Sequence, residues 1–399
     1  MAKLSQRVLR DLGTENAFVV LAQVEERKRK GQEIISFCIG QPDFDTPDNI
    51  KEAAIKAIRE GKTGYTPAQG IPEAREAISN YLSSTRGIIV SPDDVVIANG
   101  AKPFIMYTIL SVTDYGKGDE VICPNPGYPI YESAARFCGA KAVPLPLVER
   151  KNFCFDVADL ERIVNKNTKL LILNSPHNPT GGVLKKEDME AIRELAIKYD
   201  FWVLSDEVYR NLVYEGEFNS IASLPGMYER TIIMDGLSKT YAMPGWRIGF
   251  AANRILAPKL SQLMINTDSC PVHFNQYAII EALTGRQDEV ARMKASFKER
   301  RELTVSLLNE IKGVHCSLPD GAFYAFPNVT EACRIHNLSS AEELRSKLLD
   351  AGIAVLADTH FGSKNPSEKD HYLRLSYATS KDNIKAGLAI MKKVIEGGK

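Results

Sequence analysis

The chain has 399 residues, of which 44% are hydrophobic and 25% charged, as is typical of a soluble globular protein with two or three domains. Lysine plus arginine equals aspartate plus glutamate at 50 each, so the charge balance gives no sign of a nucleic-acid partner. The seven scattered cysteines show no metal-binding spacing, and no apolar run reaches the ~18 residues of a membrane span, so we expect a cytoplasmic protein that binds neither a metal nor a membrane.

The first 285 residues predict an α/β fold. A helix is expected over 16–30, a strand over 34–38 and a turn-rich segment over 40–47. From residue 48 onwards, short apolar runs alternate with helical periods, which favours right-handed crossovers and a mostly parallel sheet. The expected strands are 95–98, 120–123, 140–144, 169–173, 202–205 and 231–234, and the expected helices between them are 101–112, 130–138, 157–165 and 185–199.

A different pattern begins with a long charged helix at 286–312. It predicts a second, smaller region of the α+β type. Short strands are expected there near 314–317, 321–326, 353–357 and 371–375, with helices at 340–349 and 381–395.

The most informative string runs from Gly236 to Gly249, directly after the apolar run at 231–234. Lys239 lies near its start, and a lysine at the end of a strand can be held rigidly enough to form a Schiff base with an aldehyde cofactor. Arg247, eight residues later, offers a charged planar fork that suits a phosphate. At every specified position, the string resembles the lysine-attachment signature of the class I aminotransferases, which are pyridoxal-phosphate enzymes.

The resemblance covers essentially the whole chain, because the order of the predicted elements is similar to that of the fold-type I aminotransferases. It implies a large pyridoxal-phosphate-binding domain at 47–285, with a mostly parallel sheet of the seven-stranded type. Residues 286–399 would form the small C-terminal domain. The N-terminal segment 1–46 would supply an arm and part of that small domain.

Several motifs follow predicted strands, where open α/β sheets bind their ligands. Gly100, Ala101 and Lys102 open a helix whose free backbone N–H groups suit a phosphate. Asp206 matches a buried carboxylate that keeps the cofactor's ring nitrogen protonated, which makes the ring a better electron sink. Its neighbour Glu207 would point the other way on a strand.

The resemblance also assigns side chains around the cofactor ring. Tyr128 would lie flat against the ring, and Asn178 and Tyr209 would hydrogen-bond its phenolic oxygen. His177 falls at a variable position of its motif, so we expect it to be structural. Tyr65 matches a tyrosine that reaches the phosphate of the neighbouring subunit, which implies a homodimer with shared active sites. The implied cofactor-binding residues are Tyr65, Gly100, Ala101, Lys102, Tyr128, Asn178, Asp206, Tyr209, Ser238, Lys239 and Arg247.

Separate segments of the chain are expected to bind the substrate. Arg374 lies in a mostly apolar predicted strand, where an arginine needs a partner such as a carboxylate. The resemblance makes it the clamp for the substrate's α-carboxylate, together with Gly40 and Asn178. Lys102 resembles a lysine that binds the distal carboxylate in one branch of the family, which favours aspartate and glutamate. Asp268 would repel that carboxylate if it faced the pocket.

The implied reaction is transamination, with Lys239, Asp206 and Tyr209 as catalytic residues. Lys239 would hold pyridoxal phosphate as an aldimine and move the α-proton of an L-amino acid, and 2-oxoglutarate would accept the amino group in a ping-pong cycle. We expect aspartate first as the donor, then alanine, then an aromatic or broad specificity. The alternatives are a pyridoxal-phosphate β-lyase of the same fold and a cofactor-binding regulator. Regulators of that kind add a DNA-binding domain to this fold, and 399 residues with neutral charge leave no room for one.

Overall fold

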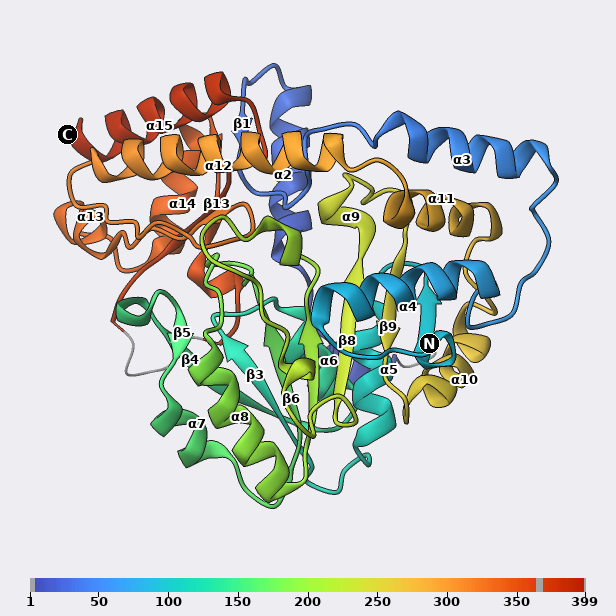
Figure 1. The fold of residues 1–399 in the computed structure, drawn as a ribbon. Helices are drawn as coiled ribbons and strands as arrows, with labels where there is room; N and C mark the ends of the chain where they lie inside the picture. Colours follow the sequence, from blue (N-terminus) through green and yellow to red (C-terminus); the bar gives the residue numbers. More distant parts are fainter. Residues whose placement is uncertain (1–3, 364–368, 398–399) are drawn as a thin grey trace.

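The computed structural model describes residues 4–363 and 369–397, which form one large mixed sheet with helices on both faces and a smaller C-terminal region (Figure 1). The strands of the large sheet lie in the order β2-β9-β8-β7-β6-β3-β4-β5. The five strands from β8 to β4 are parallel, whereas β9 and β5 run antiparallel to their neighbours. The strands are β2 (Val95–Ala98), β3 (Glu120–Asn125), β4 (Lys141–Val148), β5 (Cys154–Phe155), β6 (Thr168–Asn174), β7 (Trp202–Asp206), β8 (Thr231–Gly236) and β9 (Gly249–Ala252).

The predicted mostly parallel sheet is confirmed, and the six strands expected from apolar runs are all present. The sheet of the described residues has eight strands, and two of these were not predicted. β9 begins at Gly249, where the string that starts at Gly236 ends, and its sequence Gly-Phe-Ala-Ala contains too many small residues to show a strand pattern. β5 has only two residues, which is too short for any periodicity to indicate it.

Alternate residues of the strands pack on opposite faces of the sheet. In β2, Val96 and Ala98 pack against α5, α6 and α10, while Val95 and Ile97 pack against α4 and α11. All four side chains are buried, because a sheet covered by helices on both faces has no solvent-facing side. The covering helices are α3 (Asp48–Arg59), α4 (Pro72–Arg86), α5 (Pro103–Val112), α6 (Ile130–Phe137), α7 (Val157–Ile163), α8 (Lys186–Tyr199), α10 (Ala257–Thr267) and α11 (His273–Thr284).

The smaller region is built around an antiparallel sheet with the order β10-β13-β12. The strand predicted at 314–317 is reduced to a single bridge between His315 and Asn328, so this prediction was wrong in extent. The elements are α12 (Asp288–Asn309), β10 (Tyr324–Ala325), α13 (Thr330–Ile335), α14 (Ala341–Asp350), β11 (Ile353–Ala354), β12 (Leu356–Ala357), β13 (Leu373–Ser376) and α15 (Lys381–Glu396).

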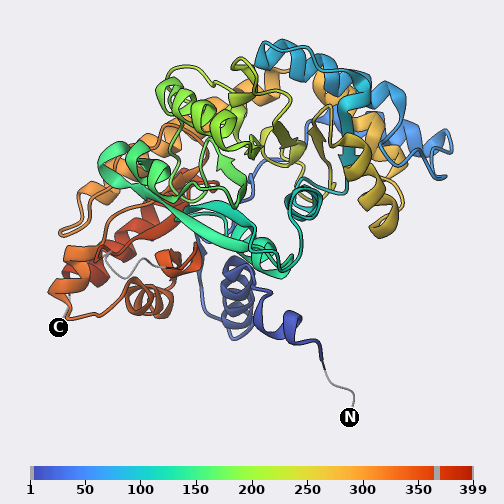
Figure 2. The ribbon, with the colours of Figure 1, turned by 90° about the horizontal axis from the view of Figure 1, so that it is seen from below.

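The N-terminal segment joins this C-terminal region. β1 (Ile35–Ser36) pairs in parallel with β11, and α2 (Asn16–Arg29) buries Ala17, Val20 and Val24 in the same apolar cluster as Leu356 of β12. Figure 2 shows α1 (Gln6–Arg10) and α2 together at the edge of the molecule. The domain boundaries at 46 and 285 stay predictions, and residues 1–3, 364–368 and 398–399 of those segments lie outside the described residues.

Within the described part of the chain, no helix is both long and apolar enough to cross a membrane. All seven cysteines are free thiols, and six of them are buried.

The strand register brings the predicted motifs to one edge of the large sheet. Asn174 at the end of β6 is paired with Asp206 at the end of β7, which is paired in turn with Met234 of β8. Gly236 ends β8 opposite Gly249 of β9. The carboxyl ends of these parallel strands are where open α/β sheets place their ligand sites.

Candidate active site

A cavity of about 530 Å³ opens at this edge of the sheet. Its walls come from the N-terminal segment, the large sheet and the C-terminal region, so residues more than 300 positions apart meet there. Among the predicted site residues, those that line it are Gly40, Ala101, Lys102, Tyr128, Asn178, Asp206, Tyr209, Ser238, Lys239, Arg247 and Arg374.

Two predicted residues lie outside the cavity lining. Gly100 lies directly behind it, against Arg247. Tyr65 is 92% exposed on the surface of the chain, as a residue offered to a second subunit would be. Asp268, which would have repelled a second carboxylate, is exposed at the end of α10 and does not line the cavity of its own chain.

Lys239 lies in the short helix α9 (Leu237–Thr240), which begins where β8 ends. Its ammonium donates a 2.6 Å hydrogen bond to the Gly40 carbonyl oxygen. Burial lowers the pKa of Lys239 to about 8, against the nearby Glu15 carboxylate, which raises it. A larger neutral fraction makes the amine a better nucleophile and base near neutral pH.

Asp206 ends β7 with its carboxylate on the cavity wall. Burial raises the pKa of Asp206 to about 7, although the Tyr131 hydroxyl donates to its Oδ2 at 2.5 Å and the Val208 N–H to its Oδ1 at 3.3 Å. A buried carboxyl group of this kind becomes ionised when a cation is placed against it. The site therefore suits a protonated ring nitrogen.

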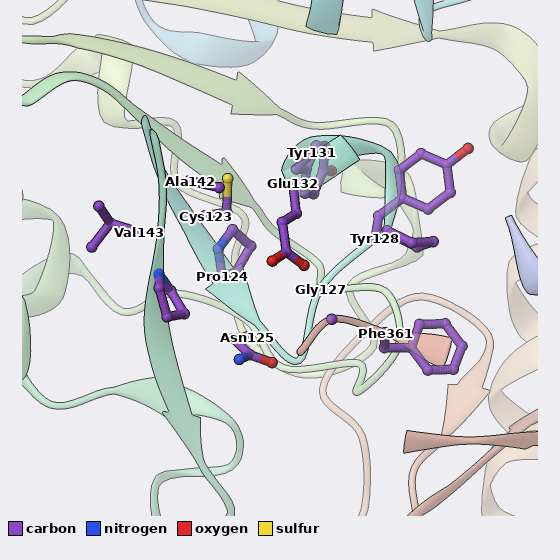
Figure 3. A pocket seen from close by; sticks show the side chains of 13 residues that line it. Cys123, Pro124, Asn125, Gly127, Tyr128, Tyr131, Glu132, Ala142, Val143 and Phe361 are labelled. Carbon is purple, nitrogen blue, oxygen red and sulfur yellow. The ribbon is translucent and has the colours of Figure 1, made fainter. Parts of the chain in front are cut away.

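Tyr131 was missed by the sequence analysis. It follows Tyr128 by three residues at the start of α6, and the two rings meet edge to face with centroids 5.5 Å apart. Figure 3 shows both tyrosines beside a small neighbouring cavity, with the Tyr128 hydroxyl directed away from Glu132. Tyr131 belongs to the same 126–131 string as Tyr128, but Tyr128 lies before α6, so helical spacing gave no signal that Tyr131 reaches the cavity.

Glu207 points away from the cavity, as its place after Asp206 predicts. Its carboxylate accepts a hydrogen bond from Arg86 Nε at 2.8 Å and from the Ser220 hydroxyl at 2.5 Å. Arg86 Nη2 also donates to Asp235 at 2.6 Å. The three charged groups form a buried network behind the strand ends that carry Asp206 and Lys239.

The wall at the start of α5 suits a phosphate. Gly100 has φ +99°, and a Cβ atom there would lie 2.4 Å from Arg247 Nη2, so only glycine lets the guanidinium lie this close. Ala101 and Lys102 follow and lead into α5, but the free N–H groups expected in its first turn are not there, because Pro103 has none and those of Phe104 and Ile105 donate to the carbonyls of Ala101 and Lys102 at 3.1 Å. Arg247 Nη1 donates to the Pro244 carbonyl at 2.8 Å. The guanidinium of Arg247 supplies the charge and the donors that an anion needs.

Arg374 is buried in β13 with an incomplete set of partners. Its Nη1 donates to Asn178 Oδ1 at 3.0 Å and its Nη2 to the Cys38 carbonyl. Its Nε is buried without a hydrogen-bond partner among the described residues. The guanidinium also lies 4.6 Å from the centroid of the Tyr324 ring. An arginine in this state suits a carboxylate ligand.

The loop after β6 places Asn178 on the cavity wall and keeps His177 away from it. The Asn178 N–H donates to Asn174 Oδ1 at 2.8 Å, and the peptide bonds before Pro176 and Pro179 are both cis. His177 is buried, with Nδ1 2.8 Å from the Thr180 hydroxyl, and burial lowers its pKa to about 3. It does not line the cavity, which agrees with a structural role.

Two more cavity residues were missed by the sequence analysis. Tyr324 of β10 lies with its hydroxyl 2.7 Å from that of Tyr209, and a Cβ atom at Gly40 would come within 1.9 Å of it. Glu15, just before α2, accepts hydrogen bonds from Lys102 and Tyr128. Neither residue lies in a motif, so only the fold brings them to the cavity.

Comparison with known proteins agrees with this geometry. The model of the family "Aminotransferase class I and II" matches residues 32–390. An aspartate aminotransferase of Pyrococcus abyssi is 39% identical over 91% of this chain and 92% of its own, and aromatic-amino-acid aminotransferase 2 of Thermococcus litoralis has the same identity and coverage. The structure of the aspartate aminotransferase from Thermus thermophilus with maleate superimposes with a TM-score of 0.91 at 33% identity, over 99% of this chain and 100% of that chain.

The chain therefore belongs to the class I and II aminotransferases, and it is an enzyme of the pyridoxal-phosphate-dependent kind. Its substrates are amino acids and oxo acids. The cavity residues fit that cofactor, because they combine an amine, an anion site and a buried carboxyl group that a ring nitrogen can ionise.

Proposed function

We propose that the chain transfers the amino group of an L-amino acid, with aspartate preferred, to 2-oxoglutarate by a ping-pong mechanism. The observation that carries this proposal is the meeting of Lys239, Asp206 and Arg374 in one cavity, although they come from three separate elements. Their chemistry is complementary, since they offer an amine, a carboxyl group and a carboxylate clamp.

Each part of the cofactor would have residues of its own. Gly100, Ala101, Lys102, Ser238 and Arg247 would hold the phosphate, and Tyr128, Asn178, Asp206 and Tyr209 would hold the ring. When bound, pyridoxal phosphate supplies an electron sink for the electrons released at the substrate's α-carbon.

The chain's own residues would position the substrate and move its proton. Arg374 would bind the α-carboxylate with its guanidinium, which Asn178 holds in position through Nη1. Lys239 Nζ would then take the α-proton as a general base, which its lowered pKa favours. A hydrogen bond with the Tyr324 hydroxyl would keep the Tyr209 hydroxyl in position.

Lys102 supports aspartate as the preferred donor, because its ammonium lies on the cavity wall where a second carboxylate could bind. The neighbour from Thermus thermophilus, solved with the dicarboxylate maleate, is an aspartate aminotransferase. A second candidate is a donor with an uncharged or aromatic side chain. It is favoured by Glu15, which already neutralises Lys102.

We further propose that the working unit is a cytoplasmic homodimer in which Tyr65 completes the partner's phosphate site. Exposed apolar side chains support a second copy, since Ile55 and Ile58 of α3 and Ile265 of α10 are all at least one-third exposed, as Tyr65 is.

Initial rates would test the reaction and its donor. Aspartate, alanine and phenylalanine should each be varied at several fixed concentrations of 2-oxoglutarate. Parallel reciprocal plots and the highest kcat/KM for aspartate are expected. Intersecting plots would contradict the ping-pong mechanism, and release of ammonia from a cysteine thioether in place of amino transfer would indicate a β-lyase.

A further inference from the structure

Glu15 places a carboxylate on the part of the cavity wall formed by Lys102 and Tyr128. Its Oε2 accepts a hydrogen bond from the Lys102 ammonium at 2.8 Å and from the Tyr128 hydroxyl at 2.9 Å. The Glu15 side chain is 20% exposed and that of Lys102 44%. The ammonium proposed for the substrate's second carboxylate is thus already paired with a carboxylate of the chain.

The contact is not a consequence of helix capping. Glu15 occupies the N-cap position of α2, with extended backbone, but its side chain makes no capping hydrogen bond. An N-cap side chain that caps its helix accepts from the N–H groups of the first turn. The Glu15 carboxylate is instead turned toward Lys102, which lies 87 residues further along the chain.

The surroundings of Lys102 suit an uncharged substrate side chain while Glu15 is in place. Lys102 Nζ lies 5.6 Å from the centroid of the Tyr128 ring and 6.0 Å from that of Phe18, and Ile105 also lines the cavity. The paired Glu15 and Lys102 have no net charge. A second carboxylate entering beside Glu15 would meet like-charge repulsion.

Glu15 can leave Lys102 without unpacking its helix. Ala17, Val20 and Val24 anchor α2 in the C-terminal region, whereas residues 12–15 form no regular secondary structure. Displacement of the carboxylate therefore needs rotation of one side chain and adjustment of this short segment.

We propose that Glu15 is a specificity-determining residue that competes with the side-chain carboxylate of a dicarboxylic substrate for Lys102 and Tyr128. With Glu15 in place, the cavity accepts amino acids with uncharged or aromatic side chains. A dicarboxylic substrate binds when its own carboxylate displaces that of Glu15. This inference rests on the proposed function, because it requires Lys102 to face the substrate's side chain.

The test compares substrate classes in the holoenzyme of Glu15→Gln, which keeps the shape of the side chain and removes its charge. The KM for aspartate and for 2-oxoglutarate should fall about 5- to 10-fold, while the KM for alanine and phenylalanine should stay within about twofold. Calorimetry should show that maleate, which has no amino group to transfer, binds more tightly by a similar factor. A role in folding alone would lower the active fraction, and with it the apparent kcat for both classes, and would leave each KM unchanged.

Glu25→Gln is the matched control, because Glu25 pairs with Lys28 at 3.6 Å on the surface of the same helix. It should change no KM. An unchanged or raised dicarboxylate KM in Glu15→Gln, or an equal change for both substrate classes, would overturn the inference.

Lys102→Gln separates this inference from the proposed function. It should raise the KM for dicarboxylic substrates about tenfold. If it left every KM unchanged, Lys102 would not face the substrate, and the proposed aspartate specificity would fail as well. If it raised the dicarboxylate KM while Glu15→Gln failed to lower it, only the role of Glu15 would be rejected.

Discussion

Burial shifts the ionisation of two cavity groups in opposite directions. It raises the pKa of Asp206 to about 7 and lowers that of Lys239 to about 8. Both shifts favour the neutral form, which is what desolvation does to an acid and to a base alike. The cavity therefore suits a ligand that places a positive charge against Asp206 and reacts with the neutral amine of Lys239.

Substitution of these two residues should remove activity to different degrees. Lys239→Ala is expected to abolish turnover, a loss of about 10³-fold or more, because no other amine replaces its proton transfer. Asp206→Asn should lower kcat about 100-fold, since the amide cannot hold a cation. Lys141→Ala, which removes an exposed lysine paired with Glu120, serves as the control in the same rate assay. Normal transamination by purified Lys239→Ala would contradict the proposed mechanism.

The free energy of unfolding of the cofactor-free protein should depend on pH because the pKa of Asp206 is raised. Between about pH 4, its ordinary value, and about pH 7, the folded protein holds a proton that the unfolded chain has released. The free energy of unfolding should therefore fall as the pH rises through this range, and Asp206→Asn should remove this contribution. Urea unfolding of both proteins at several pH values measures the difference, and a difference that does not change with pH would argue against the buried carboxyl group.

Local strings were sufficient to predict 11 of the 25 residues that line the cavity. Lys239 and Asn178 follow the ends of β8 and β6, Asp206 ends β7 and Arg247 lies just before β9, so the strand order brings all four to one edge of the sheet. Glu15 could not be predicted in this way, because an isolated acidic residue before a helix carries no signal of a partner 87 residues away.

At the scale of elements, a buried charge network ties α4 to the ends of β7 and β8. Arg86 of α4 bonds Glu207 and Asp235, and all three side chains are at most 3% exposed. These carboxylates adjoin Asp206 and Gly236, so the network fixes the strand ends that present Asp206 and Lys239. It was not predictable, since Arg86 lies more than a hundred positions of sequence away from both carboxylates.

Arg86→Met should destabilise the protein by about 3–5 kcal/mol, because two buried carboxylates lose their cation. Arg286→Met is the matched control, since Arg286 and Asp288 form an ion pair whose side chains are 85% and 69% exposed. Its effect should stay below about 1 kcal/mol. Urea unfolding of the holoenzymes measures both values, and similar losses in the two variants would show that the network does not matter for stability.

Whether a strand could be predicted from the sequence depended on its length and on how many of its apolar residues are buried. Strands with four or more buried apolar residues, such as β2 and β6, were visible as runs in the sequence. β5, with two residues, owes its existence to the neighbouring strand β4 rather than to its own pattern. β9 was not predicted because small residues such as Gly249 and Ala252 do not favour a strand.

For the whole molecule, the chain order predicts the architecture because helices and strands alternate throughout the large sheet. The return of the N-terminal segment to the C-terminal region rests on the short β1–β11 pairing and on α2, which only the resemblance to a family implied. Tyr65 is 92% exposed and does not line the cavity of its own chain, which agrees with the proposed contact to a second copy.

A mixed dimer would test whether active sites are shared. If Tyr65 serves the partner's site, co-expression of Lys239→Ala with Tyr65→Ala gives mixed dimers in which one site has both defects and the other has neither. Their specific activity should exceed that of either variant alone and approach half of the wild-type value per dimer. No gain over the parent variants, or a mass equal to that of one chain in sedimentation, would reject the shared site.

The absorbance of the bound cofactor tests the proposed reaction most directly. Aspartate, alanine, phenylalanine and glutamate should be added separately to the purified holoenzyme while the spectrum is recorded. We expect the cofactor band to be lost with aspartate at the lowest concentration and restored when 2-oxoglutarate is added. A band that none of these amino acids changes would contradict transamination at Lys239.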